Sequence, residues 1–259
     1  MKKLKAAILC LLIAFSLLFV SACSPSPEKI IKKADSYIDS SAYCVDLDMI
    51  FTSDYAPLDA LFDTIRSTDI TLFIKESDLL LKIRSEESNS NIYSEYILVD
   101  NKVYSSSLVQ IGEDTKSEKL TADINDEERS EFLEEAKSAA NVTPDDFATL
   151  VATKDKGEHV VICTNLKDAS EEQLIRLMNS YFGAENATVT VSNAKLLMRF
   201  EGKKYKSVTL ECEYSVTYYG KTYRINAAIG MQYRYDYEFE IQPPKNSDEY
   251  ERVPYESIR

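Results

Sequence analysis

The strands near the end of the chain decide the fold, and residues 205–241 read YKSVTLECEYSVTYYGKTYRINAAIGMQYRYDYEFEI. Every second side chain from Val208 to Tyr218 is apolar or aromatic, and a second such row runs from Met231 to Ile241. This alternation is typical of strands with one buried face. Turn signals at Glu201-Gly202 and Gly220-Lys221 separate the runs. We therefore expect antiparallel strands at 189–200, 205–219, 222–230 and 231–241.

The same reasoning extends upstream. Alternating or β-branched runs predict strands at 43–51, 70–74, 79–83, 92–99, 103–107 and 159–164. Asp100-Asn101 between two of these runs predicts a tight hairpin turn. Helical spacing and capping residues predict helices at 26–40, at 127–140, in a short stretch opened by Thr143-Pro144 and at 170–182. Residues 112–127 are polar, and we predict no strand there. The whole pattern indicates antiparallel strands with helices packed on the sheet.

The first 22 residues have the pattern of a secretory signal. Lys2, Lys3 and Lys5 precede an apolar run from Ala6 to Val20, and small residues follow it. The run is shorter than the roughly 20 residues of a membrane-spanning helix. We expect the segment 1–22 to direct export and to be removed.

Val20-Ser21-Ala22-Cys23 resembles the lipobox of bacterial lipoproteins, although the first position of that motif is more often Leu. The resemblance implies that the Cys23 thiol receives a diacylglycerol and that residues 23–26 form a lipidated tether. Each buried methylene adds about 0.8 kcal/mol, so two or more acyl chains anchor a protein stably. The implied location is the extracytoplasmic face of the cell membrane. The alternative is an ordinary secretory signal in which Cys23 lies near the cut by chance.

Charge and cysteines narrow the function classes. Removal of residues 1–22 leaves 237 residues with 27 basic and 43 acidic side chains, a net charge of −16. This charge disfavours nucleic acid as a partner and means that lipid must hold the chain to the membrane. Cys44, Cys163 and Cys212 contain no Cys-x-x-Cys pair, and Cys44 shares a polar face with Asp46. We interpret the three as buried or half-buried thiols.

No motif for catalysis or for a bound cofactor is found in the sequence. The single histidine, His159, lies in a predicted strand, so a zinc site lacks ligands. Six scattered glycines cannot form a Walker or dinucleotide-binding pattern, and no Gly-x-Ser-x-Gly occurs. Pairs such as Asp145-Asp146 are abundant and are best explained as a solvated acidic face. We expect no enzyme activity, no metal and no cofactor.

Tyrosine is the unusual residue of this chain: there are seventeen, with no tryptophan, and ten of them follow residue 200. Rows of tyrosines suit the wall of a groove for amphipathic or hydrophobic ligands. They suit sheet propensity and core packing equally well, and packing is the simpler explanation. The candidate ligand-binding residues are Tyr214, Tyr218, Tyr223, Tyr233, Tyr235 and Tyr237.

The layout over residues 27–243 resembles the LolA/LppX-like superfamily, in which a helix follows the lipidated cysteine, antiparallel strands enclose inserted helices and a meander ends in Ile-x-Pro. The resemblance implies an α+β fold: a curved antiparallel half-barrel whose concave face is covered by helices over an apolar cavity. Members include carriers of lipoproteins and of acylated lipids, as well as many Gram-positive lipoproteins without known function. The resemblance therefore implies a module that binds a hydrophobic or lipid ligand. Residues 244–259 would then be a loose, polar, acidic tail. The alternative is an interaction or sensory accessory of the envelope with a filled core.

Overall fold

The computed structural model describes residues 25–56, 59, 62, 68–87, 90–137, 142–182, 188–218, 220–236 and 238–258. The predicted signal 1–22 and Cys23 lie outside the described residues. The helices are α2 (Pro27–Ile38), α4 (Asp126–Lys137) and α5 (Asp168–Phe182), with short 3-10 helices η1 (Pro144–Asp146), η2 (Ser247–Glu249) and η3 (Tyr255–Ser257). The strands are β1 (Tyr43–Ser53), β2 (Thr68–Lys75), β3 (Asp78–Glu87), β4 (Ser90–Val99), β5 (Lys102–Ile111), β6 (Asp114–Asp123), β7 (Phe147–Asp155), β8 (Glu158–Leu166), β9 (Thr188–Glu201), β10 (Lys204–Tyr218), β11 (Lys221–Arg234) and β12 (Glu251–Arg252).

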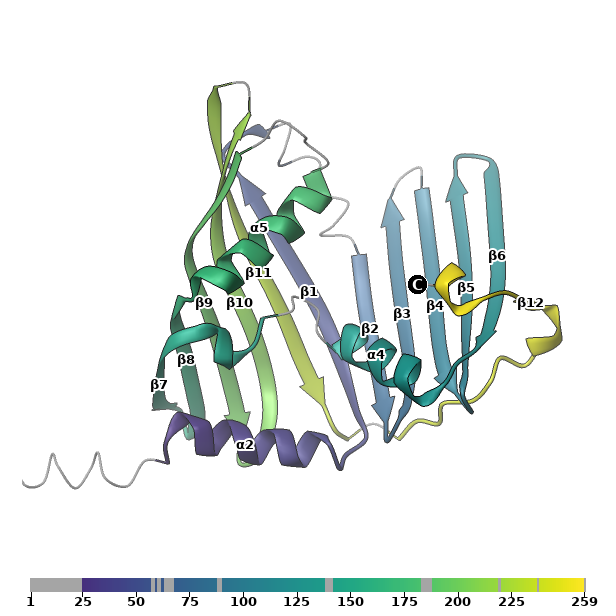
Figure 1. Cartoon of the computed structure of the whole chain (residues 1–259), viewed down its shortest axis with the longest axis horizontal. Helices are drawn as coiled ribbons and strands as arrows, with labels where there is room; N and C mark the ends of the chain where they lie inside the picture. The colour runs from purple at the N-terminus through teal and green to yellow at the C-terminus, as the bar shows by residue number, and fades with distance from the viewer. Residues whose placement is uncertain are drawn as a thin grey trace, which may run out of the picture.

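The strands of the described residues form one twelve-stranded sheet in the order β12-β6-β5-β4-β3-β2-β1-β11-β10-β9-β8-β7. Two meanders of sequential hairpins, β1 to β6 and β7 to β11, therefore lie next to each other (Figure 1). The β1–β11 pair joins them, with Val45 opposite Tyr233 and Phe51 opposite Ala227. All pairs are antiparallel except β12–β6. The sheet is open and is neither closed nor strongly curled.

The helices cover one face of the sheet. α5 crosses in front of β8 to β11, and α4 lies in front of β2 and β3 (Figure 1). Leu174 of α5 and Ala34 of α2 are fully buried against the strands of the second meander. Phe132 and Leu133 of α4 pack on the first meander. The expected antiparallel sheet with helices on one face is confirmed, but the chain is mostly β and its sheet is flatter than the expected half-barrel.

Several local predictions are confirmed. α2 begins at Pro27 after Ser26 at the N-cap, although the Ser26 hydroxyl makes no capping hydrogen bond. Asp100 and Asn101 have φ of 51° and 58°, the positive values that a type I′ turn needs. Cys44, Cys163 and Cys212 are buried free thiols. Cys44 lies on the face of the sheet opposite the other two, as its alternation with Asp46 predicted.

Other predictions are wrong. The polar residues 114–123 form β6, and the short helix expected after Thr143 is a single 3-10 turn followed by β7. Residues 222–230 and 231–234 belong to one strand, β11, and the described residues from 235 to 241 are not in a strand. Phe239 turns to the opposite face, where its ring lies 5.3 Å from that of Phe73.

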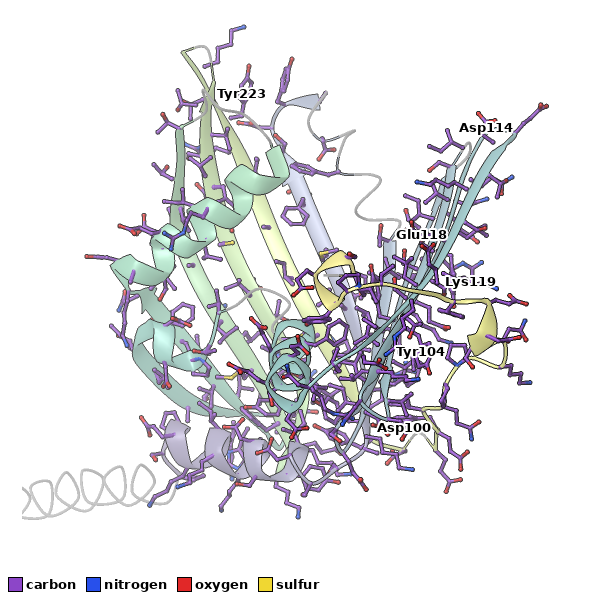
Figure 2. The ribbon with its side chains drawn as sticks, turned by 45° about the vertical axis from the view of Figure 1, so that its right-hand side comes forward. Asp100, Tyr104, Asp114, Glu118, Lys119 and Tyr223 are labelled. Atoms are coloured by element: carbon purple, nitrogen blue, oxygen red, sulfur yellow. The ribbon has the colours of Figure 1, made fainter. Side chains whose placement is uncertain are left out.

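The C-terminal residues are packed and not loose. After Arg234 the chain crosses the face opposite the helices, where Ile241 and Tyr250 contact Ile97, Val99 and Tyr104. Tyr250 lies against Tyr104 of β5, with ring centroids 5.5 Å apart, and Lys119 of β6 lies over the Tyr250 ring (Figure 2). The chain then adds β12 and returns to the helix-covered face. There Tyr255 and Ile258 are 6% and 9% exposed. Residues 244–258, part of the stretch predicted to be a loose polar tail, thus pack on both faces of the first meander.

Candidate functional site

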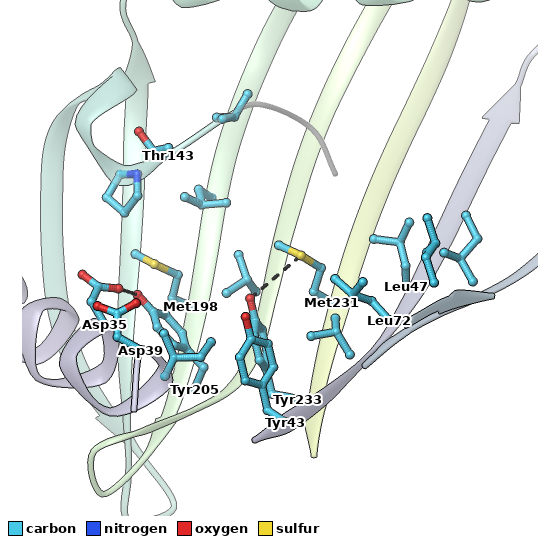
Figure 3. Close-up of a pocket in the computed structure, with 18 residues that line it drawn as sticks. Asp35, Asp39, Tyr43, Leu47, Leu72, Thr143, Met198, Tyr205, Met231 and Tyr233 are labelled. Atoms are coloured by element: carbon cyan, nitrogen blue, oxygen red, sulfur yellow. Dashed lines mark hydrogen bonds between the residues drawn. The ribbon is translucent and has the colours of Figure 1, made fainter. Parts of the chain in front are cut away.

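A pocket of about 310 Å³ lies on the helix-covered face, close to the β1–β11 junction of the two meanders (Figure 3). Its walls come from the C-terminal half of α2, the segment before η1, and strands on both sides of the junction. The lining residues are Asp35, Ile38, Asp39, Tyr43, Val45, Leu47, Ile70, Leu72, Leu81, Val142, Thr143, Pro144, Leu196, Met198, Tyr205, Val208, Met231 and Tyr233. Aliphatic, thioether and aromatic side chains predominate.

The two ends of the pocket differ in chemistry. Leu47 and Leu72 lie at one end, and the carboxylates of Asp35 and Asp39 lie at the other (Figure 3). Both aspartates are on the exposed side of α2, so they stand at the mouth of the pocket and not within its apolar part. Among the described lining residues there is no lysine, arginine or histidine. The site is therefore an apolar pocket with an acidic end.

Three tyrosines connect the two ends. The Tyr205 hydroxyl donates a hydrogen bond of 2.6 Å to Asp35 Oδ1. The Tyr205 and Tyr233 rings are stacked with centroids 5.4 Å apart, and the Tyr43 and Tyr233 centroids are 6.1 Å apart. Figure 3 shows the hydroxyls of Tyr43 and Tyr233 pointing into the pocket. The Tyr233 hydroxyl contacts Met231 Sδ at 3.9 Å, which is a weak acceptor.

Burial disfavours the ionised form of these phenols. It raises the pKa of Tyr233 to about 12, and the charge of Asp35 adds to the effect. Burial also raises the pKa of Tyr43 and of Tyr205 above the usual value, and for Tyr205 the hydrogen bond to Asp35 raises it further. A neutral phenol in an apolar wall offers one donor and an acceptor oxygen. The tyrosines can therefore orient a polar group but are not poised as bases.

Strand register brings the site together. Val45 on β1 pairs with Tyr233 on β11 and with Leu72 on β2, so all three side chains point to the helix-covered face. Met231 pairs with Leu47 and with Val208 in the same way. Tyr205 reaches the site from the start of β10, where it is 8% exposed. The pocket is therefore enclosed between these strands, the C-terminal half of α2 and residues 142–144.

The candidate tyrosines have different positions in the structure. Tyr233 lines the pocket. Tyr214 is 2% exposed in the core, so the packing explanation holds for it. Tyr223 lies at the far end of β11, with its ring 4.6 Å from that of Tyr55 (Figure 2). Tyr235 lies beyond the pocket against Tyr37, at 5.4 Å. The Tyr218 side chain and Tyr237 lie outside the described part of the chain.

Sequence reasoning missed most of the pocket. Asp35, Asp39, Tyr43, Met198 and Tyr205 were not candidates, although all five line it. One signal was present: Asp35 and Asp39 are one helical turn apart, beside the apolar face of α2. The contribution of Tyr43 and Tyr205 depends on pairing between distant strands, which alternation alone does not give.

The remaining polar groups form no recognisable centre. No cluster of three or more His, Cys, Asp or Glu side chains suited to a metal is found within the described ranges. Asp145 and Asp146 belong to the η1 turn, where Asp146 accepts hydrogen bonds from Thr143 and Ser170. These bonds hold the pKa of Asp146 below its usual value against the effect of burial. None of the helices described has the length and apolarity that a bilayer-spanning helix needs.

Comparison with known proteins gives no match, either to a family model or to a curated protein.

Proposed function

We propose that this protein is a non-catalytic, extracytoplasmic lipoprotein, anchored to the cell membrane through lipid on Cys23, which binds or carries a hydrophobic or lipid ligand. The observation that carries the proposal is the apolar pocket of about 310 Å³ between the sheet and α2. Ligand pockets are typically 300–1,000 Å³, concave and mostly apolar, with a few polar groups that fix orientation. The volume suits one short chain and not a multi-chain lipid.

The fold agrees with this proposal at a coarse level. We propose that the open sheet is a flattened form of the LolA/LppX-like half-barrel, with α2, α4 and α5 on the face that would be concave. In such an arrangement a ligand enters between the sheet and the helices. Here that space is the region between α2 and the β1–β11 junction, which the pocket occupies.

Ligand binding is tested with the full chain carrying Cys23→Ser, which retains every described residue. Mass spectrometry of molecules that co-purify without detergent, and titration with a fluorescent acyl probe, should both reveal an apolar ligand. Leu47→Trp should abolish probe binding because the indole fills the pocket. Ile50→Trp is the matched control, because Ile50 is on the other face of β1 and 53% exposed. The proposal fails if nothing apolar co-purifies and the probe does not bind.

The anchor is tested separately. Cys23→Ser should move the protein from the membrane fraction into the medium, because no acyl chain can then be attached. Cys10→Ser, within the predicted signal, serves as the control and should leave the protein at the membrane. Unchanged membrane retention of the Cys23→Ser protein would contradict lipidation.

A second candidate function is an interaction or sensory accessory of another envelope protein. Exposed apolar residues at the far ends of β4 and β5 favour it: Ile92 is 36% exposed and Ile111 is 63% exposed. Exposed apolar patches often mark protein interaction sites. Absence of a bound ligand, together with unchanged probe signals in Leu47→Trp and Ile50→Trp, would favour this second function.

A further inference from the structure

The side chains at the mouth of the pocket indicate the charge of the ligand's head group. This inference rests on the proposed ligand-binding function. Asp35 and Asp39 lie one turn apart at the mouth. Like charges at this spacing repel each other. Within the described part of the chain, neither carboxylate has an ion pair with a basic side chain, and the carboxylate of Asp39 has no hydrogen bond. The acidic end therefore lacks a compensating positive charge.

An independent observation comes from Tyr43. This side chain is only 4% exposed, its hydroxyl points into the pocket, and it has no hydrogen-bond partner among the described residues (Figure 3). The Tyr43 hydroxyl is not one of the fully enclosed unpaired atoms of the described residues, so it faces the open volume of the pocket, where a ligand group or water can bond to it. The Tyr233 hydroxyl next to it has only the weak Met231 Sδ contact. Two phenols thus point toward space in which a polar ligand group would satisfy them.

The charge of that polar group follows from the lining. A carboxylate or phosphate head would lie next to two carboxylates with no lysine or arginine in the described lining, which is repulsive. An ammonium head has the opposite character: its N–H groups can donate to Asp35 and Asp39 and to phenol oxygens. The stacked Tyr205 and Tyr233 rings add an aromatic surface, which attracts cations.

We propose that the pocket takes a single-chain amphiphile with a cationic, amine-type head. The head lies between Asp35, Asp39 and the phenols of Tyr43 and Tyr205, and the hydrocarbon chain extends toward Leu47 and Leu72. Asp35 keeps its hydrogen bond from Tyr205, because a carboxylate has about four acceptor positions and Tyr205 uses one. The structure thus distinguishes this site from one for fatty acids or phosphate-bearing lipids.

The experiment compares three probes with the same eight-carbon chain: octylamine, octanoate and octan-1-ol. Calorimetric titrations at pH 7 use the full chain with Cys23→Ser. We expect octylamine to bind about tenfold more tightly than octanoate, since two partly exposed charge pairs favour one and oppose the other. Asp35→Asn with Asp39→Asn should remove that preference and leave octan-1-ol binding unchanged. Glu28→Gln is the matched control, because it removes one charge from α2 and does not line the pocket.

Each outcome decides between the claims. If octanoate binds as tightly as octylamine, or if the double variant keeps the preference, the cationic head is wrong while the apolar site stands. If no probe binds, the proposed ligand-binding function fails as well. Asp39→Asn alone is a second variant, which is needed if loss of the Asp35 carboxylate perturbs α2. It should lower the octylamine preference in part, and an unchanged preference in this folded variant would overturn the proposal.

Discussion

Tyr205 links α2 to the sheet through a single hydrogen bond. Its hydroxyl donates to Asp35 Oδ1 at 2.6 Å, and its ring packs between Phe200 and Tyr233. We predict that Tyr205→Phe lowers the free energy of unfolding by about 1–2 kcal/mol, because the ring is kept and one bond to a charged acceptor is lost. Urea denaturation followed by circular dichroism measures the change.

The control for this prediction is Tyr223→Phe. The Tyr223 ring lies 4.6 Å from that of Tyr55, at the end of β11 away from the pocket, and no hydrogen bond of its hydroxyl is found in the described residues. It should change stability by less than about 0.5 kcal/mol. Equal effects of the two substitutions would show that the Asp35 contact contributes nothing.

Buried phenols make the folded protein sensitive to alkali. The pKa of Tyr233 is raised from 10.0 to about 12, mainly by burial. The folded state therefore holds this proton more tightly than the unfolded state does. Its contribution is fully present below about pH 10 and is lost as the pH rises toward 12. We predict that the urea midpoint falls across this range and falls less steeply in Tyr233→Phe. A midpoint independent of pH up to 12 would contradict the assignment.

At the scale of elements, most strands and helices were predictable because their own residues carry local signals: alternation, capping residues or turn residues. Asp100-Asn101 is one example, since both residues tolerate positive φ. β6 shows no alternation of apolar and polar residues, because it lies near the edge of the sheet and most of its side chains are exposed. Its pairing with β5, with Val103 opposite Ala122, defines it as a strand. β7 was missed because the Thr143-Asp146 capping box suggested a longer helix.

Arg129 attaches α4 to two hairpin turns of the first meander. Its guanidinium donates to Asp78 Oδ1 at 2.7 Å, to Ser77 O at 2.7 Å and to Asn101 Oδ1 at 3.0 Å, and its side chain is 12% exposed. We predict that Arg129→Met costs about 2 kcal/mol of stability, because these partners lose a charged donor.

Thermal and urea unfolding of the purified protein measure this effect. Arg176→Met is the matched control, since Arg176 is an exposed residue of α5. It should change stability by less than about 0.5 kcal/mol. If Arg129→Met is equally harmless, the link between α4 and the turns does not stabilise the fold.

At the scale of the whole molecule, the C-terminal residues close the first meander. Ile258 is 9% exposed and packs in the cluster that includes Leu79 and Leu98. We predict that Ile258→Ala lowers the free energy of unfolding by about 2 kcal/mol through the cavity that it leaves. Glu256→Ala, at an exposed position of η3, should change it by less than about 0.5 kcal/mol. Equal unfolding midpoints for the two variants would show that the final turn is not part of the core.

The site was less predictable than the fold for a physical reason. Alternation tells which face of a strand a tyrosine is on, and the same face carries both Tyr214, which fills the core, and Tyr233, which lines the pocket. The difference depends on where the helices lie above the sheet. Helix placement is a property of the assembled core, so no row of tyrosines in one strand could reveal it.

The junction of β1 with β11 has a consequence for how this chain acquires its structure. During synthesis Cys44 of β1 emerges early, whereas Arg234 of β11, its partner in the sheet, emerges almost at the end. Each meander can form from hairpins as it appears, since its strands are sequential neighbours. The unpaired side of β1 is then an open strand edge until β11 has emerged. Holdase chaperones that shield this transient edge should raise the yield of folded protein, and a circular permutant with ends between β6 and β7 should make the pairing local and need them less.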